Sequence, residues 1–199
     1  MSGNLAPLGP DTVHVVIDMQ RLFDEETGWR VPDLAATLPP IARLIEHRPA
    51  RALYARFITP ATIGESKGAW QSYYRQWPQV IQDRLPAGIF DLVAPLARHA
   101  APHQQFDKQG FSAFSGPSFP GMLRDLGAST LVLSGVETDV CVLSTALEAI
   151  ERGLRVVVAT DAVTSSSPAG HRATLDHVLP RFEHMLDLAP SADIIAAWS

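Results

Sequence analysis

The sequence predicts an α/β fold in which a mostly parallel, open sheet of about six strands carries helices on both faces, with residues 1–199 forming a single domain. The first observation behind this is that continuous apolar runs alternate with helical patterns along the chain. Runs such as TLVLSG (130–135) and VVVAT (156–160) are typical of parallel strands that are buried on both faces. The second is that 199 residues with 46% hydrophobic content suit one compact core.

The strands are expected at short apolar runs and the helices at segments with helical spacing of apolar residues. The expected strands cover residues 13–17, 51–58, 103–106, 130–134, 155–160 and 185–188. The expected helices cover residues 33–47, 88–99, 119–126, 139–152, 168–179 and a short final stretch through Trp198. Pro39 and Pro40 interrupt the first of these helices, so its start is also compatible with a position near residue 38.

Residues 59–86 have no clean period and are rich in aromatic side chains, including Trp70, Tyr73, Tyr74 and Trp77. We expect a long loop with short helical pieces. Two roles fit it equally well: a wall or lid of a binding pocket, or a contact between copies of the chain.

Composition narrows the functional classes. The formal charge is −5 and no run of Lys or Arg occurs, so a nucleic-acid partner is not expected. No apolar stretch approaches the ~18 residues of a membrane span, and the first residues do not resemble a signal peptide, so no membrane association is expected and the protein is expected in the cytoplasm. One cysteine, Cys141, rules out an internal disulfide.

Three polar residues stand at or near the ends of predicted strands, where open α/β sheets bind ligands: Asp18, Lys108 and Cys141. Cys141 falls in the first turn of a predicted helix, where free N–H groups favour a thiolate and could hold an oxyanion. It could equally be a small buried side chain.

Lys108 is one of two lysines in a chain that otherwise uses arginine, and a lysine can release its proton when it is desolvated. A surface lysine is the alternative, as a turn or cap carboxylate is for Asp18. Together, a thiol, a carboxylate and an amine at one rim would supply a nucleophile, a base and a charge partner.

Three segments, VVIDMQRLF (15–23), FDKQGFSAF (106–114) and GVETDVCVLSTALEA (135–149), closely resemble the isochorismatase-like cysteine hydrolase superfamily. Nicotinamidases and N-carbamoylsarcosine amidohydrolase belong to that superfamily. The resemblance runs from about residue 12 to residue 188, and its three ordered motifs are specific for the superfamily but much less so for the substrate.

The resemblance implies a catalytic triad of Asp18, Lys108 and Cys141, with the backbone N–H groups of Glu137 and Cys141 forming an oxyanion hole. It also implies a cis peptide bond between Val136 and Glu137. The implied reaction is hydrolysis of an amide or ureido C–N bond in a small molecule through a covalent thioester. It further implies a homo-oligomer, a dimer or a tetramer.

Two departures from better-known members narrow this implied chemistry. Nicotinamidases place metal-binding aspartate and histidine just after the second strand, where this chain has Phe57 and Thr59. We therefore expect neither a metal nor another cofactor. Isochorismatases that cleave a vinyl ether lack the cysteine, so Cys141 favours cleavage of an amide-type bond.

The substrate pocket is expected to be aromatic. Its expected lining is Phe23, Phe57, Trp70, Tyr74 and Phe114. Such a pocket suits a small, uncharged or partly apolar amide. Arg56, Arg75 or Glu137 would change that expectation if their side chains turned inward.

Other functions remain open at this level. Cys141 could be a redox-sensing thiol in a protein that binds or signals without turnover. His171 and Ser165–Ser167 also lie near a strand end, but they lack the G-x-S-x-G pattern of a serine nucleophile. A nucleotide-binding domain is disfavoured because neither G-x-G-x-x-G nor the P-loop pattern occurs.

Overall fold

The computed structural model describes residues 5–199 and contains one six-stranded sheet. Its strands are β1 (Thr12–Ile17), β2 (Ala52–Phe57), β3 (Gln105–Lys108), β4 (Thr130–Val136), β5 (Arg155–Thr164) and β6 (Leu186–Ala189). All neighbouring strands pair in parallel, in the order β3-β2-β1-β4-β5-β6. The predicted fold class is confirmed, and the sheet is entirely parallel. The strand order reverses between β1 and β4, and such a point opens a crevice at the carboxyl ends of the strands.

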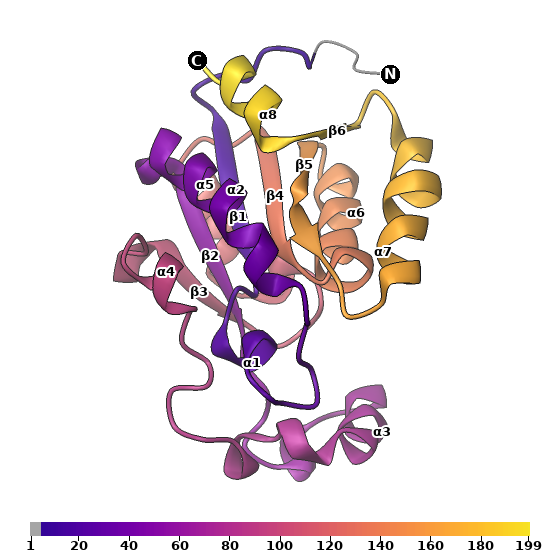
Figure 1. Cartoon of the computed structure of the whole chain (residues 1–199). Helices are drawn as coiled ribbons and strands as arrows, with labels where there is room; N and C mark the ends of the chain where they lie inside the picture. The colour runs from indigo at the N-terminus through magenta and orange to yellow at the C-terminus, as the bar shows by residue number, and fades with distance from the viewer. Residues whose placement is uncertain (1–4) are drawn as a thin grey trace.

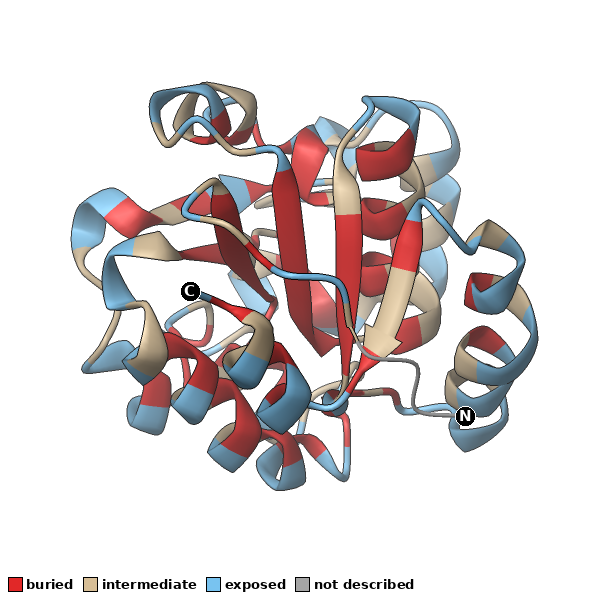
Figure 2. Cartoon of the chain, turned by 90° about the horizontal axis from the view of Figure 1, so that it is seen from above, coloured by how far each residue is buried: buried red, intermediate tan, exposed pale blue. Residues whose placement is uncertain are grey.

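Helices cover both faces of the sheet (Figure 1). The α-helices are α1 (Arg21–Asp24), α2 (Leu34–His47), α3 (Ala69–Gln76), α4 (Ala94–Ala97), α5 (Phe119–Asp125), α6 (Leu143–Glu151), α7 (Pro168–Ala173) and α8 (Ser191–Ala197). Helices α2 and α8 lie on one face, and α5 and α6 lie on the other. Every residue of β1 and of β4 is buried, whereas the helices expose their outer sides (Figure 2). Burial on both faces explains why these strands read as continuous apolar runs.

Several predicted boundaries differ from the structure. The helix expected over residues 88–99 is reduced to α4, because the apolar residues before it pack against the chain that follows β1. Leu92 forms an antiparallel bridge with Gln20, and the N–H of Val93 donates to the carbonyl of Met19 at 3.0 Å. The helix α2 starts at Leu34 and accommodates both internal prolines.

Two further shifts lie closer to the strand ends that carry the candidate site. Strand β3 is displaced by two residues from its expected place, so Lys108 is its last residue. The helix expected to start at residue 139 begins as a π-helical turn, Thr138–Val142, before α6. A second π turn, Thr174–Val178, follows α7 within the predicted helix 168–179.

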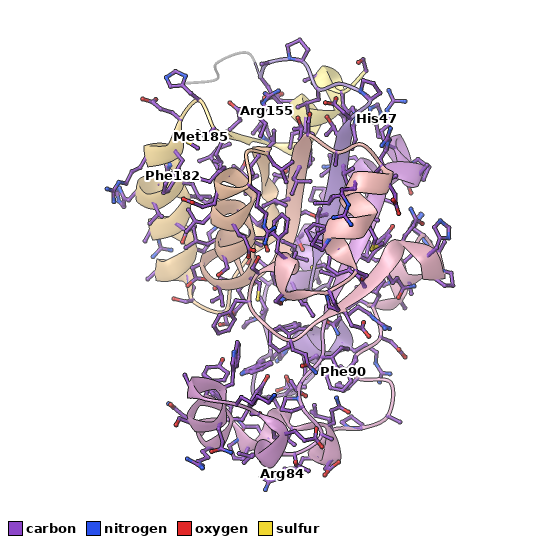
Figure 3. All side chains as sticks on the ribbon, turned by 180° about the vertical axis from the view of Figure 1, so that it is seen from behind. His47, Arg84, Phe90, Arg155, Phe182 and Met185 are labelled. Carbon is purple, nitrogen blue, oxygen red and sulfur yellow. The ribbon has the colours of Figure 1, made fainter. Side chains whose placement is uncertain are left out.

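Residues 59–86 form the expected loop with short helical pieces, among them α3, and lie below the carboxyl edge of the sheet (Figure 1). They hold their own hydrophobic cluster, built on Tyr74, Val80 and Ile81. Figure 3 shows Phe90 where this part meets the body of the protein and Arg84 at its far end. The aromatic side chains of this segment are thus placed against the end of the sheet where ligands bind.

A polar pair is buried in the centre of the sheet. The Nε2 atom of His14 on β1 lies 2.8 Å from the hydroxyl of Ser134 on β4, and both residues are fully buried. Burial lowers the pKa of His14 to about 3, so the imidazole is neutral at ordinary pH. The two strands that lead into the candidate site are therefore joined by a buried hydrogen bond, and burial keeps its histidine neutral.

Candidate active site

The carboxyl ends of three strands bring Asp18, Lys108 and Cys141 into contact. Asp18 follows β1, Lys108 ends β3, and Cys141 lies in the turn after β4. The Nζ atom of Lys108 is 2.8 Å from Oδ2 of Asp18 and 3.5 Å from Sγ of Cys141, so the ammonium lies between the carboxylate and the thiol. All three side chains are buried. A nucleophile, a carboxylate and a cation thus share one enclosed site, as the sequence predicted.

The backbone at the end of β1 adopts an uncommon conformation. Asp18 has φ +54°, a left-handed value that is rare for residues other than glycine and that often marks functional sites. Its N–H donates to the carbonyl of Ala55 on β2 at 3.1 Å. The chain therefore turns away from the sheet at Asp18, although the backbone of Asp18 is still hydrogen-bonded to β2.

Gly135 determines how closely β1 and β4 approach beside Asp18. It lies opposite Ile17 in the register and has φ +106°. A Cβ atom at this position would come within 2.0 Å of the carbonyl oxygen of Ile17. Only glycine fits at this position, two residues before Glu137.

Lys108 is held as an ammonium ion. Besides Asp18 and Cys141, its Nζ contacts the carbonyl oxygens of Gly110 and Phe111, each at 3.0 Å, and lies 4.4 Å from the centre of the Phe57 ring. Burial alone would lower the pKa of Lys108, but Asp18 and the other partners outweigh it and raise the pKa above its usual value. The raised pKa favours the charged form of Lys108, which suits a charge partner of Asp18.

The cysteine is a thiol in the resting site. Burial raises the pKa of Cys141 well above its usual value, although the Lys108 ammonium opposes this shift. The neutral thiol is favoured over the expected thiolate, because the effect of desolvation exceeds that of the Lys108 charge. Burial also raises the pKa of Asp18, despite Lys108, which makes this carboxylate a stronger base toward the neighbouring thiol.

The turn that carries Cys141 is fixed by hydrogen bonds at both ends. The carbonyl of Glu137 accepts from the N–H groups of Val140 and Val142, both at 3.1 Å, and the hydroxyl of Thr145 donates to the carbonyl of Cys141 at 2.7 Å. The bond between Val136 and Glu137 is cis.

Cys141 opens into a narrow aromatic pocket with a cavity volume of about 40 Å³. The lining residues are Phe23, Trp29, Phe57, Tyr73, Phe111, Glu137, Val140 and Cys141. The side chains come from the strand ends, the Cys141 turn and the segment below the sheet. Residues 59–86 therefore supply a wall of this pocket through Tyr73 on α3.

The structure places the expected pocket residues in different positions. Phe23 and Phe57 line the pocket. Trp70 stands behind Phe111, with 4.8 Å between ring centres, and with Tyr74 it lines a separate surface cavity instead. Phe114 packs against Phe119 and lies 4.5 Å from the guanidinium of Arg152, so it belongs to the packing around α6.

Four lining residues, Trp29, Tyr73, Phe111 and Val140, were missed by the sequence analysis. Phe111 and Val140 lie within the two motifs that carry Lys108 and Cys141, so proximity to those motifs was a usable signal. Tyr73 is adjacent to the expected Tyr74, and the orientation of the short helix α3 determines which of them faces inward. Trp29 lies in an irregular loop whose position no periodicity reveals.

One charged residue lines the pocket, and two other charged side chains point elsewhere. Glu137 lines the pocket, and its Oε1 accepts the N–H of Ser166 at 2.9 Å. Arg56 forms an ion pair with Asp107 at 2.7 Å, and Arg75 donates to a glutamine on its own helix. The pocket is therefore aromatic with a carboxylate at its wall.

The serine and histidine considered as a second catalytic pair are not joined to each other. Nδ1 of His171 lies 2.9 Å from the hydroxyl of Thr138, in the turn that carries Cys141. The hydroxyl oxygens of both serines accept hydrogen bonds from the local backbone. The hydroxyl of Ser165 accepts from the N–H of Ser167, and that of Ser167 accepts from the N–H of Gly170 in α7. His171 thus supports the Cys141 turn.

The residues around the pocket do not fit a metal site of the nicotinamidase kind. Phe57 presents its ring to the pocket and to Lys108, and Thr59 is buried. Within residues 5–199, no group of three or more His, Cys, Asp or Glu side chains is arranged to hold a metal ion. No step of the chemistry below is assigned to a metal.

The same part of the chain contains no helix that is both long and apolar enough to cross a membrane.

An all-parallel α/β sheet with a buried Asp–Lys–Cys cluster at the switch point defines the class, that of the isochorismatase-like hydrolases. The model of the isochorismatase domain matches residues 12–190, and the chain belongs to the isochorismatase family. A cysteine hydrolase from Pseudomonas syringae pv. phaseolicola superposes with a TM-score of 0.79 at 23% identity, covering 99% of this chain and 98% of that one. This likeness shows the fold.

Two curated relatives bear on the function. The Bacillus subtilis protein PncA, described as an uncharacterized isochorismatase family protein, is 42% identical over 71 residues, which are 36% of this chain and 39% of the relative. The chain thus spans about two fifths of the length of that relative. The ureidoacrylate amidohydrolase RutB of Methylorubrum extorquens is 28% identical over 181 residues, covering 79% of this chain and 71% of the relative.

Proposed function

We propose that this chain is a cysteine hydrolase that cleaves a C–N bond, of the amide or ureido type, in a small molecule through a covalent thioester at Cys141. The observation that carries the proposal is the buried contact of Cys141 with Lys108 and Asp18 at the floor of the aromatic pocket. A relative described as an amidohydrolase supports the same bond type.

In the first half-reaction, Asp18 takes the proton of the thiol while Sγ attacks the substrate carbonyl carbon. The carbonyl oxygen becomes an oxyanion, and in this proposal the N–H groups of Glu137 and Cys141 donate to it. When the oxyanion collapses, the C–N bond breaks, and the departing nitrogen takes the proton from Asp18. Ammonia or an amine leaves, and the acyl group stays on Cys141 as a thioester.

In the second half-reaction, Asp18 accepts a proton from water as the oxygen attacks the thioester carbon. The same N–H groups hold the second oxyanion. The C–S bond breaks, Cys141 recovers its proton from Asp18, and a carboxylic or carbamic acid is released. Lys108 keeps its charge throughout and holds the carboxylate in place, because its remaining contacts are to the carbonyl oxygens of Gly110 and Phe111.

The test is intact-protein mass spectrometry after brief exposure to small amides, ureido compounds and activated esters, with wild type and Cys141→Ala compared. We expect an adduct that forms and decays in wild type and is absent from the variant, with turnover lower by at least about 10³-fold in the variant. Unchanged turnover in Cys141→Ala would overturn the proposal. Cys141→Ser, which retains a weaker nucleophile, checks that the loss is chemical.

The alternative of a redox-sensing thiol receives no support from the geometry. A sensor cysteine is exposed and has a low pKa, whereas Cys141 is 5% exposed and burial raises its pKa. Reversible oxidation of Cys141 by dilute peroxide, with no adduct from any acyl compound, would favour the sensor.

On the resemblance to its superfamily, the proposed enzyme acts as a homo-oligomer, a dimer or a tetramer, in the cytoplasm. Sedimentation velocity of the purified chain tests the assembly, and a single monomeric species would contradict it.

A further inference from the structure

The wall of the pocket is a ring of aromatic side chains that contact one another. Trp29 is central: its ring centre is 6.1 Å from that of Phe23, 5.5 Å from Phe57 and 6.0 Å from Tyr73. Tyr73 in turn lies 6.1 Å from Phe111. Each ring face carries partial negative charge, and such groups of rings hold organic cations.

The formal charge at the pocket is negative, like the partial charge on the faces of the aromatic rings. Within residues 5–199, Glu137 is the one charged residue among those that line the pocket. The N–H of Ser166 holds one oxygen of its carboxylate, which fixes that group before a ligand arrives. Glu137 and Tyr73 line the same pocket, so the fixed carboxylate belongs to a residue beside the ring wall.

Among residues 5–199, no Lys, Arg or His side chain lines the pocket to meet an anionic ligand. The Lys108 ammonium is buried beneath the pocket and is engaged by Asp18, Cys141 and two carbonyl oxygens. Arg56 is paired with Asp107. A carboxylate in the pocket would therefore face Glu137 and the aromatic rings without a partner.

We infer that the substrate carries a positively charged nitrogen, a primary or quaternary ammonium group, next to the bond that is cleaved. The aromatic rings surround this group and Glu137 neutralises it, while the carbonyl carbon faces Cys141. This inference names the substrate class and so rests on the proposed function, but the preference of the pocket for cations can be measured without turnover.

The test uses the reactivity of Cys141, the one cysteine of the chain. Three methanethiosulfonates are compared: the cationic 2-(trimethylammonio)ethyl, the neutral 3,3-dimethylbutyl and the anionic 2-sulfonatoethyl reagents. The thiolate attacks the sulfenyl sulfur, a disulfide forms and methanesulfinate leaves, while the thiol proton passes to Asp18. Rates of labelling, each divided by the rate with a free small thiol, report the preference of the pocket.

We expect the cationic reagent to label wild type about tenfold faster than its neutral isostere, and the anionic reagent to be slowest. In Glu137→Gln, which keeps the size and the acceptor for Ser166, the cationic advantage should fall roughly three- to tenfold. Glu151→Gln removes the same charge from an exposed position and is the matched control for the net charge of −5.

A cationic reagent no faster than the neutral one in wild type, or an advantage that falls equally in Glu137→Gln and Glu151→Gln, would overturn the inference.

A second measurement needs no variant: tetramethylammonium should slow alkylation of Cys141 by iodoacetamide, and tert-butanol at the same concentration should not. Equal protection by both also overturns it. If the cation preference holds but no amide or ureide is hydrolysed, the proposed function fails and the pocket preference stands.

Discussion

His14 should make the protein sensitive to mild acid. The folded chain keeps His14 neutral, because burial lowers its pKa to about 3 from the ordinary 6.5 of a histidine. Because the folded pKa is depressed, the stabilising contribution of the neutral imidazole is complete above pH 6.5 and is lost as the pH falls toward 3. At about pH 5, His14 is protonated in the unfolded chain and neutral in the folded chain. This difference lowers the free energy of unfolding by about 2 kcal/mol.

The measurement is urea unfolding at several values between about pH 8 and about pH 5, for wild type and His14→Gln. Glutamine cannot titrate and can still bond to Ser134, so the free energy of unfolding of the variant should fall about 2 kcal/mol less than that of wild type over this range. His103→Gln, at an exposed position, controls for loss of an imidazole. Parallel curves for wild type and His14→Gln would refute the reasoning, as would a direct titration that places His14 near 6.5.

Two further variants test the construction of the site. Lys108→Met should lower the free energy of unfolding by roughly 3–5 kcal/mol and abolish turnover, because it leaves the Asp18 carboxylate buried without its cation. Adding Asp18→Asn should restore stability but not activity, and no restoration in denaturant unfolding would contradict the pairing. Gly135→Ala should cost at least about 3 kcal/mol in the same assay, since its Cβ would meet the Ile17 carbonyl. Gly127→Ala, also at positive φ but with open space around it, should cost about 1 kcal/mol; equal losses at the two positions would argue against the clash.

The part of the site that depends on strand ends could be predicted from the sequence. In a parallel sheet, polar residues that terminate apolar runs converge at one edge, so Asp18, Lys108 and Cys141 were correctly placed together. The same logic gave the fold, since each central strand is buried on both faces and reads as an unbroken apolar run.

The parts set by long-range packing could not be predicted. The segment 88–99 has the apolar content of a helix, but Leu92 and Val93 bind the chain after β1 instead. The protonation states of Cys141 and Lys108 depend on complete burial and on each other, which no local pattern reveals. Which of Tyr73 and Tyr74 enters the pocket depends on how α3 docks, and its eight residues are too few to fix that alone.

Because residues 59–86 have their own hydrophobic cluster, the reacting groups and part of the pocket wall belong to separately packed parts of the fold. The reacting groups stand on strand ends within the main core, whereas part of the surface that selects the substrate belongs to a segment with its own small apolar centre at Tyr74, Val80 and Ile81. Substitutions there change the shape of the pocket without opening a cavity in the sheet. New substrate preferences can therefore arise in this segment at little risk to folding, while the chemistry stays the same.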